Sequence, residues 1–236
     1  MTTVAGIDVS SHQPRDLSAI IAATAAEHVV TKMYLPMESI SQDHTRAQVA
    51  SAQAHGCSVG GYVWGYRSVD PGETIDAVIA LCASMGLVLP LLWLDCEVYL
   101  DDPGPERGWL RAAKARADFY GMKLGIYTGV WWIDGHFPGG QAAFAEFADW
   151  PLWLADYRNW GDIGNVPRPL GFDHLEGWQW SGASIDRDWF DESVTVYQSA
   201  PPPDPCAELR AAVQAIADRR PYRAPSRKVL REVLGK

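Results

Sequence analysis

The stretch Leu89-Pro90-Leu91-Leu92-Trp93-Leu94-Asp95-Cys96-Glu97 joins an apolar run to two carboxylates. A short apolar segment of this kind predicts a buried strand, over Leu89–Asp95, that delivers the two acids to its carboxyl end. Because side chains alternate along a strand, Asp95 and Glu97 are expected on the same side, with Cα atoms about 6.6 Å apart. Two neighbouring carboxyls can differ in pKa, so that one is charged while the other holds a proton. Cleavage of a glycosidic bond needs such a pair; a solvated or salt-bridged pair is the alternative.

Apolar runs and amphipathic stretches alternate on both sides of this segment. The other predicted strands are Val4–Asp8, Val29–Met33, Val59–Trp64, Leu124–Tyr127, Leu152–Ala155 and Gly177–Trp180. The predicted helices are Asp16–Glu27, Asp43–His55, Glu73–Met85, Glu106–Tyr120 and Gln141–Phe147. This alternation predicts an α/β fold with a parallel sheet, closed into an irregular TIM-like (β/α) barrel with shortened later helices. An open doubly wound sheet is the alternative, but the glycines typical of its first turn are missing from Asp8–Gln13.

The C-terminal part of the chain differs from the rest in composition. Residues 1–197 are expected to form the barrel, and residues 198–205, with four prolines, a Pro-rich linker. Residues 206–236 carry eight Lys and Arg against three Asp and Glu, and apolar side chains recur at helical spacing, which predicts a basic helical tail. The tail could bind the cell wall, form an oligomer or attach the chain to a larger particle such as a virion; a solvated extension is the alternative.

Composition excludes several classes of partner. The first 205 residues carry 12 Lys and Arg against 26 Asp and Glu, and such an acidic body argues against nucleic acid as the ligand. No apolar stretch reaches the roughly 18 residues that predict a membrane span. The first residues show no basic segment followed by an apolar one, so no signal peptide is predicted. The four cysteines follow no metal-binding or disulfide spacing, and neither a metal nor another cofactor is expected.

Acidic and aromatic residues gather where the predicted strands end, which is where barrel enzymes carry their chemistry. The acids at these positions are Asp8, Asp95, Glu97, Asp156, Asp186 and Asp188. Eleven tryptophans is a high number, and flat rings suit the apolar faces of sugars. At least half of the aromatic residues are nevertheless expected to fill the core between barrel and helices, Trp93 and Trp109 among them.

Seven segments match a known family in its own order. They are Gly6–Gln13, Val30–Lys32, Gly60–Trp64, Trp93–Glu97, Gly125–Thr128, Leu152–Tyr157, and Trp178–Ser181 with Ile185-Asp186. Through them the chain resembles glycoside hydrolase family 25, the lysozyme-like N-acetylmuramidases, which include phage endolysins. The resemblance spans residues 4 to about 191 and implies hydrolysis of the β-1,4 bonds between N-acetylmuramic acid and N-acetylglucosamine in bacterial peptidoglycan.

The resemblance also implies roles for individual residues. Glu97 would be the general acid, Asp95 would hold Glu97 or the sugar, and Asp8 and Asp186 would be the other catalytic acids, with Asp188 competing for the last position. The family implies retention of anomeric configuration, with the nucleophile left open between the enzyme and the substrate's acetamide. Substrate contacts are predicted for Lys32, Tyr62, Trp64, Tyr127, Trp153, Tyr157, Gln179 and Trp180.

Two departures from the family pattern lie near the start of the chain. Pro14-Arg15-Asp16-Leu17 stands where the family often has Gly and then Ile-Asp-Trp, and Met33-Tyr34-Leu35 stands where a small residue and Glu-Gly are common. They motivate an alternative function, a wall-binding or structural barrel of a virion assembly with weak or no catalysis. Since no signal peptide is predicted, a phage-encoded lysin or virion-associated hydrolase that acts on the host cell wall is the expected setting.

Overall fold

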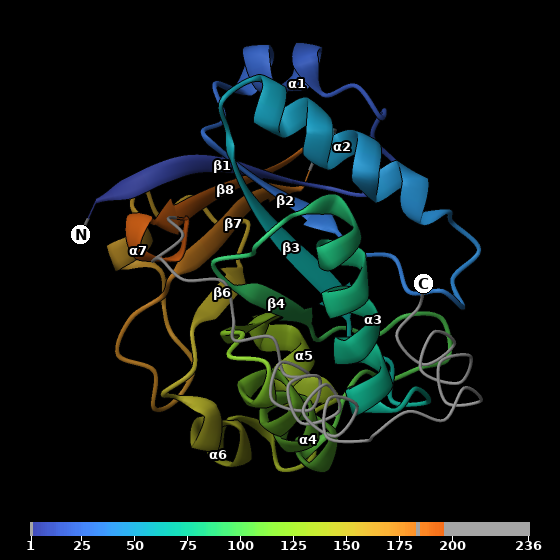
Figure 1. Ribbon diagram of the computed structural model, residues 1–236. Helices are drawn as coiled ribbons and strands as arrows, with labels where there is room; N and C mark the ends of the chain where they lie inside the picture. The colour runs from blue at the N-terminus through green and yellow to red at the C-terminus, as the bar shows by residue number, and fades with distance from the viewer. Residues whose placement is uncertain (1, 183–184, 196–236) are drawn as a thin grey trace, which may run out of the picture. The chain divides into compact units, whose positions relative to one another are not determined.

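The computed structural model describes residues 2–182 and 185–195, and within these ranges eight strands close into one barrel in chain order (Figure 1). The strands are β1 (Thr3–Val9), β2 (His28–Lys32), β3 (Ser58–Trp64), β4 (Leu92–Asp95), β5 (Leu124–Gly129), β6 (Leu152–Ala155), β7 (Gly177–Gly182) and β8 (Asp186–Asp191). The predicted α/β, TIM-like barrel is therefore confirmed. Strand β4 begins at Leu92, later than predicted, because Pro90 has no backbone N–H to donate to a sheet ladder.

The last strand differs from the prediction of an all-parallel sheet. β8 pairs antiparallel with both β1 and β7, whereas the remaining neighbours are parallel. Asp186 and Asp188 therefore lie within a strand and do not follow the last one, as the sequence had suggested. Only three residues separate β7 from β8, too few for the crossover of about a dozen residues that a parallel pair needs.

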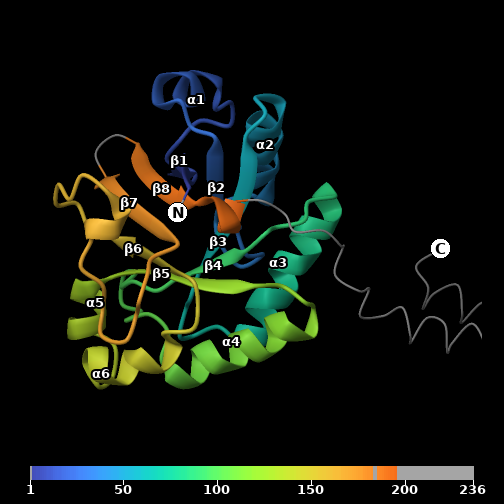
Figure 2. The same cartoon turned by 90° about the vertical axis from the view of Figure 1, so that its left-hand side faces the viewer.

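Helices lie outside the barrel, as Figures 1 and 2 show. They are α1 (Ser18–Thr24), α2 (Gln42–Ala54), α3 (Pro71–Met85), α4 (Arg107–Phe119), α5 (Val130–Gly135), α6 (Gly140–Phe144) and α7 (Glu192–Thr195), with 3₁₀ turns at Ala145–Phe147 and Ile163–Asn165. The expected shortening of the later helices is confirmed. Helix α3 illustrates the local rules, since the Asp70 side chain accepts hydrogen bonds from Gly72 N and Glu73 N, and Gly86 ends the helix at φ +62°.

Two apolar cores are separated by the wall of the barrel. Trp109 belongs to the outer core between strands and helices, as predicted, and its Nε1 donates to Val69 O at 2.8 Å. Trp93 lies instead inside the barrel, in contact with the rings of Trp153 and Phe190. The prediction for Trp93 was wrong because the alternation that turns Asp95 inward turns Trp93 inward as well. The inner core forms an aromatic floor (Trp93, Tyr127, Trp153 and Phe190), which we call the floor below.

The floor is expected to be a main source of stability. Trp93 is 1 % exposed, so Trp93→Ala should lower the free energy of unfolding by about 3–5 kcal/mol, because it removes buried apolar surface and leaves a cavity. Urea unfolding followed by circular dichroism measures the change. Trp131→Ala is the matched control, since Trp131 is 52 % exposed and should cost no more than about 0.5 kcal/mol. Equal losses of unfolding free energy in the two variants would contradict the view that the floor is a main source of stability.

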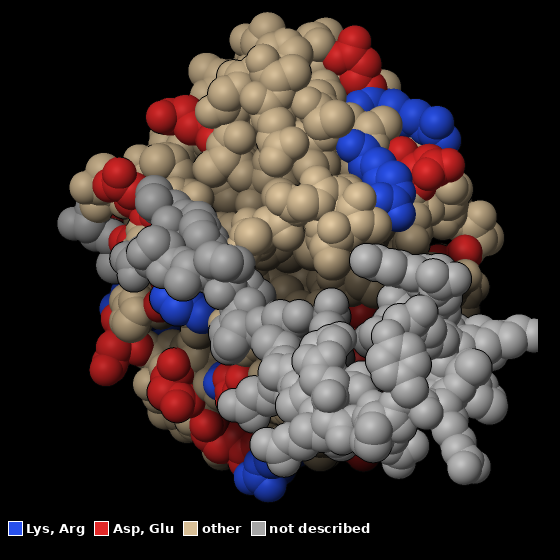
Figure 3. Space-filling view, in the orientation of Figure 1, with Lys and Arg blue, Asp and Glu red and all other residues tan. Residues whose placement is uncertain are grey.

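Several other sequence predictions can be compared with the structure. Cys57, Cys82 and Cys96 are buried free thiols, as expected, whereas Cys206 lies outside the described residues. The predicted linker 198–205 and tail 206–236 also lie outside them. No helix among the described residues is long and apolar enough to span a membrane. On the face drawn in Figure 3, a broad area is uncharged, and the Lys and Arg side chains that the structure describes lie near Asp and Glu side chains around it.

Candidate active site

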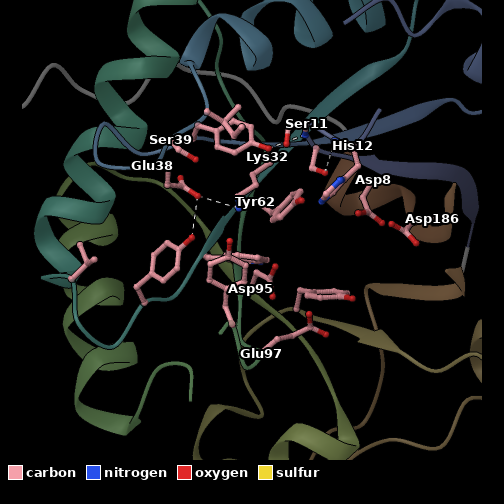
Figure 4. A pocket seen from close by; sticks show the side chains of 18 of the residues that line it. Asp8, Ser11, His12, Lys32, Glu38, Ser39, Tyr62, Asp95, Glu97 and Asp186 are labelled. Carbon is pink, nitrogen blue, oxygen red and sulfur yellow. Dashed lines mark hydrogen bonds and ion pairs between the residues drawn. The ribbon is translucent and has the colours of Figure 1, made fainter. Parts of the chain in front are cut away.

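A cavity of about 720 Å³ opens at the carboxyl ends of the strands (Figure 4). It brings together all the predicted site residues except one. Those that line it are Asp8, Lys32, Tyr62, Trp64, Asp95, Glu97, Tyr127, Trp153, Tyr157, Gln179 and Asp186. Strands β1 to β7 end at this rim and the antiparallel β8 begins there, so residues far apart in the sequence meet at it.

Trp180 is the exception, because it does not line the cavity. Strand β7 turns Gln179 into the barrel, so the alternation directs Trp178 and Trp180 outward. Trp180 packs against the outer core, and the guanidinium of Arg187 lies 5.7 Å from its ring centroid. The predicted substrate contact by Trp180 therefore has no support in the geometry.

The four predicted catalytic acids converge from three strands. Asp95 ends β4, and Glu97 follows two residues later on the same side of the chain. Asp8 on β1 and Asp186 on β8 are directly opposite each other in the antiparallel register. Figure 4 shows these two carboxyls together on one side of the cavity, apart from Asp95 and Glu97. The cavity therefore contains two acid pairs from different strands.

Burial and mutual repulsion set the protonation of these acids. Burial, followed by the charge of Asp186, raises the pKa of Glu97 to about 7. Burial and the charge of Glu97 raise the pKa of Asp95 well above its usual range, and the Lys32 ammonium opposes that rise. Burial also raises the pKa of Asp186, with His12 acting in the opposite direction. A carboxyl that holds a proton up to neutral pH is the requirement for a general acid.

Lys32 is held by a residue that the sequence analysis missed. Lys32 Nζ lies 3.1 Å from Glu38 Oε1 and 3.6 Å from the ring centroid of Trp64. Glu38 also accepts hydrogen bonds from Tyr66 OH at 3.0 Å and from Leu35 N at 2.6 Å. The signal was available, because the Glu expected soon after Lys32 is absent and Glu38 is the first acid to follow it. Glu38 therefore forms an ion pair with Lys32 and links it to Tyr66 on one wall of the cavity.

Gln179 connects two tyrosines with Asp8. Its Nε2 donates to Asp8 Oδ2 at 2.7 Å, and its Oε1 accepts from Tyr127 OH at 2.9 Å and from Tyr157 OH at 2.7 Å. Gln179 and Tyr127 are buried, whereas Tyr157 is 59 % exposed and presents its ring at the mouth. The network fixes which way the Gln179 amide points and thereby supplies a donor to Asp8.

Asp156 and Asp188, the remaining strand-end acids, do not line the cavity. Arg158 Nε donates to Asp156 Oδ1 at 2.8 Å, and its hydrogen bonds lower the pKa of this acid. Asp188 lies deeper in the barrel than Asp186, two residues along β8, and is 2 % exposed. Of the two competing positions, Asp186 is thus the one that faces the cavity. Among the described residues, no group of three or more His, Cys, Asp and Glu side chains is arranged to hold a metal ion.

Solved structures with a similar fold cover most of this chain. A muramidase from Acremonium alcalophilum matches with a TM-score of 0.62 and 22% identity, over 80% of this chain and 93% of that one. A family GH25 lysozyme from Aspergillus fumigatus matches with a TM-score of 0.60 and 20% identity, over 80% and 94% of the two chains. A family 25 glycosyl hydrolase from Bacillus anthracis matches with a TM-score of 0.57 and 16% identity, over 80% and 90%. At these identities the likeness establishes the fold.

The family of this chain is established by a match to a sequence profile. A search of curated proteins gave no match. The profile described as "Glycosyl hydrolases family 25" matches residues 7–189, which span β1 to β8 and all four converging acids. The chain belongs to glycosyl hydrolase family 25.

Proposed function

We propose that this glycoside hydrolase cleaves the β-1,4 bonds between N-acetylmuramic acid and N-acetylglucosamine in peptidoglycan, with Glu97 as the general acid. The observation that carries the proposal is the partly buried Glu97, whose pKa of about 7 results from burial and from Asp186, in a cavity lined by four further carboxyls. Family membership supports the reaction type, and similar folds that are named muramidases support the substrate.

The proposed reaction assigns one task to each part of the cavity. Glu97 transfers its proton to the glycosidic oxygen as the bond from that oxygen to the anomeric carbon breaks, so the leaving sugar departs as a neutral alcohol. Positive charge that develops on the anomeric carbon and ring oxygen is stabilised by Asp186. Asp186 also orients the acetamido group, whose oxygen can attack the anomeric carbon from the opposite face. Asp95 keeps Glu97 in position, while the charge of Asp186 raises the cost of ionising Glu97.

Exposed rings at the mouth suit a sugar chain. Tyr99 and Tyr157 line the cavity and are 40 % and 59 % exposed, and the ring of Tyr99 packs on that of Trp64. Aromatic faces of this kind pack against the C–H faces of sugars. On this basis we propose that Trp64 and Tyr157 contact the substrate. Lys32 would hold the ring of Trp64 in place.

Analysis of the reaction products tests the proposed bond. Purified peptidoglycan is treated with the parent protein, released reducing sugar is quantified, and the fragments are identified by mass spectrometry. Muramic acid at the new reducing ends is the expected result. N-acetylglucosamine at those ends would contradict the assignment of the bond, and a lack of release from several wall types would favour the alternative of a wall-binding or structural barrel.

A pH profile tests the assignment of the acid. Because only protonated Glu97 can donate, kcat/KM should fall above pH 7, by about tenfold per pH unit once Glu97 is ionised. Initial rates of reducing-sugar release, measured between roughly pH 5 and 9, give the profile. Tryptophan fluorescence over the same range controls for unfolding. A rate that stays constant up to pH 9 in folded protein would contradict the role of Glu97.

The setting in which the enzyme acts is still a prediction. A phage-encoded lysin, or a virion-associated enzyme attached through residues 206–236, was expected from the sequence, whereas the similar structures named above come from fungi and a bacterium. Truncation after Ser199 tests the part played by the tail. Turnover of soluble glycan should be unchanged in the truncated enzyme, while any association that depends on the tail should be lost.

A further inference from the structure

Asp188 is a buried acid to which the proposed reaction gives no task. It lies on β8 between β1 and β7, opposite Gly6 on one side and Gln179 on the other, and it is 2 % exposed. Trp153 Nε1, from the floor, donates to Asp188 Oδ1 at 3.0 Å. Asp188 Oδ2 is fully buried and receives no hydrogen bond from any amide, hydroxyl or ring N–H in the described part of the chain. A buried oxygen of this kind is costly unless another group satisfies it.

The carboxyl that acts on Asp188 from β1 is that of Asp8, which lies two residues beyond Gly6, the register partner of Asp188. Two carboxylates cannot form a hydrogen bond, because both are acceptors only, so a hydrogen bond between these acids requires that one of them carry a proton. Asp8 reaches the cavity and already accepts from Gln179 Nε2 at 2.7 Å, which favours the acceptor role for Asp8. Asp188 lies deeper and has one donor, Trp153, which favours the protonated form for Asp188.

The surroundings favour a proton on the pair as a whole, since burial and the charge of Asp186 raise the pKa of Asp8 as well, to about 8, while the hydrogen bond from Gln179 opposes that rise. The other titratable groups that act on the pair are three acids and three phenols: Asp186 on β8 and, on the side of Asp8, Glu97, Asp95, Tyr62, Tyr127 and Tyr157. His12 acts on Asp186. Burial is the largest cause that raises the pKa of Asp188 well above its usual range, and the charges of Asp8 and Asp186 add to it.

We propose that Asp188 is a positioning residue which holds a proton and donates it in a hydrogen bond to Asp8. Asp8 then has two fixed donors, Gln179 and Asp188, that set the direction of its carboxyl toward the substrate. Trp153 in turn sets the direction of Asp188, so the floor of the barrel is connected with the catalytic acids. The inference rests on the proposed glycosidase function.

Two substitutions of similar size at position 188 distinguish the need for a hydrogen-bond donor from the need for a carboxyl. Asp188→Asn can still accept from Trp153 through its amide oxygen and donate to Asp8 through its amide nitrogen. Its kcat should stay within about threefold of the parent, and its pH profile should be unchanged. Asp188→Leu lacks the donor and should lose roughly 10²-fold in kcat with little change in KM, because a misdirected group affects the transition state most. Asp191→Asn, at the end of the same strand, is the control and should match the parent.

Carbon-13 NMR of carboxyl-labelled aspartate supplies a readout that does not depend on activity. The carboxyl resonance that disappears in Asp188→Asn belongs to Asp188, and it should show the protonated form throughout roughly pH 5 to 8. A resonance of the carboxylate form at neutral pH, or an inactive Asp188→Asn protein that folds normally, would overturn the proposal. If Asp188→Leu does not fold, the NMR spectrum and the activity of Asp188→Asn still test the proposal. An inactive parent would instead refute the proposed function, while the NMR result would stand.

Discussion

Glu97→Gln is expected to lower kcat by about 10³-fold while the protein stays folded and still binds peptidoglycan. The amide has nearly the shape of the carboxyl but has no proton to transfer at the pH of the reaction. The pKa of Glu97, raised to about 7 by burial and by the charge of Asp186, lets this acid exchange its proton near neutrality. Release of reducing sugar from purified peptidoglycan measures the loss, and sedimentation with insoluble walls measures binding.

The matched control for this substitution is Glu106→Gln. Glu106 is exposed and precedes α4, and its side chain makes no capping hydrogen bond, so the same change of charge should leave kcat and stability unaltered. Circular dichroism and thermal unfolding of both variants show whether the fold is kept. A Glu97→Gln protein that lyses walls as fast as the parent would remove Glu97 from the mechanism and leave the general acid to be sought among the other carboxyls.

Asp186→Asn should cause the second largest loss, about 10²-fold in kcat with KM nearly unchanged. Asp186 faces the cavity beside Asp8, where its negative charge stabilises the positive charge that develops in the transition state. That charge is absent from the bound substrate, so the loss should be confined to kcat. Rates on a soluble peptidoglycan fragment, measured over a range of concentrations, separate kcat from KM.

The comparison of Asp186→Asn with Asp188→Asn distinguishes the two acids of β8. The first is expected to lose activity and the second to keep it, because only Asp186 faces the cavity while Asp188 needs no more than a donor. The opposite pattern would transfer the electrostatic role to Asp188. A substrate whose muramic acid carries an N-acyl group with a less nucleophilic carbonyl oxygen should be cleaved more slowly by the parent if the acetamide attacks the anomeric carbon.

Local patterns were sufficient to predict much of the barrel. Apolar runs located β1 to β7 within a few residues, because those strands are buried on both faces and read as continuous hydrophobic segments. Strand β8 was missed because its sequence forms no continuous hydrophobic segment. Asp186-Arg187-Asp188-Trp189-Phe190-Asp191 holds four charged residues and two aromatic ones, and its direction depends on the short connection from β7 and not on its own composition.

The site was more predictable than its supporting contacts. Asp95 and Glu97 could be placed from their position at the end of an apolar strand, and Asp8 and Asp186 from the family resemblance. Glu38 could be singled out as the first acid after Lys32, but its contact with Lys32 depends on the path of a loop that no periodicity specifies. Trp93 and Trp180 show the limit of composition, since only the alternation within each strand decides whether a ring points into the barrel or away from it.

The floor also governs how a polymer can reach the catalytic acids. Trp93, Trp153 and Phe190 are almost completely buried and in mutual contact, so the barrel has no passage from one end to the other. A long glycan strand cannot be threaded through and drawn along from one end. It has to lie across the mouth and leave by the side from which it came. Cuts can therefore fall anywhere along the strand, so the mean strand length should drop early in digestion, well before most bonds are broken.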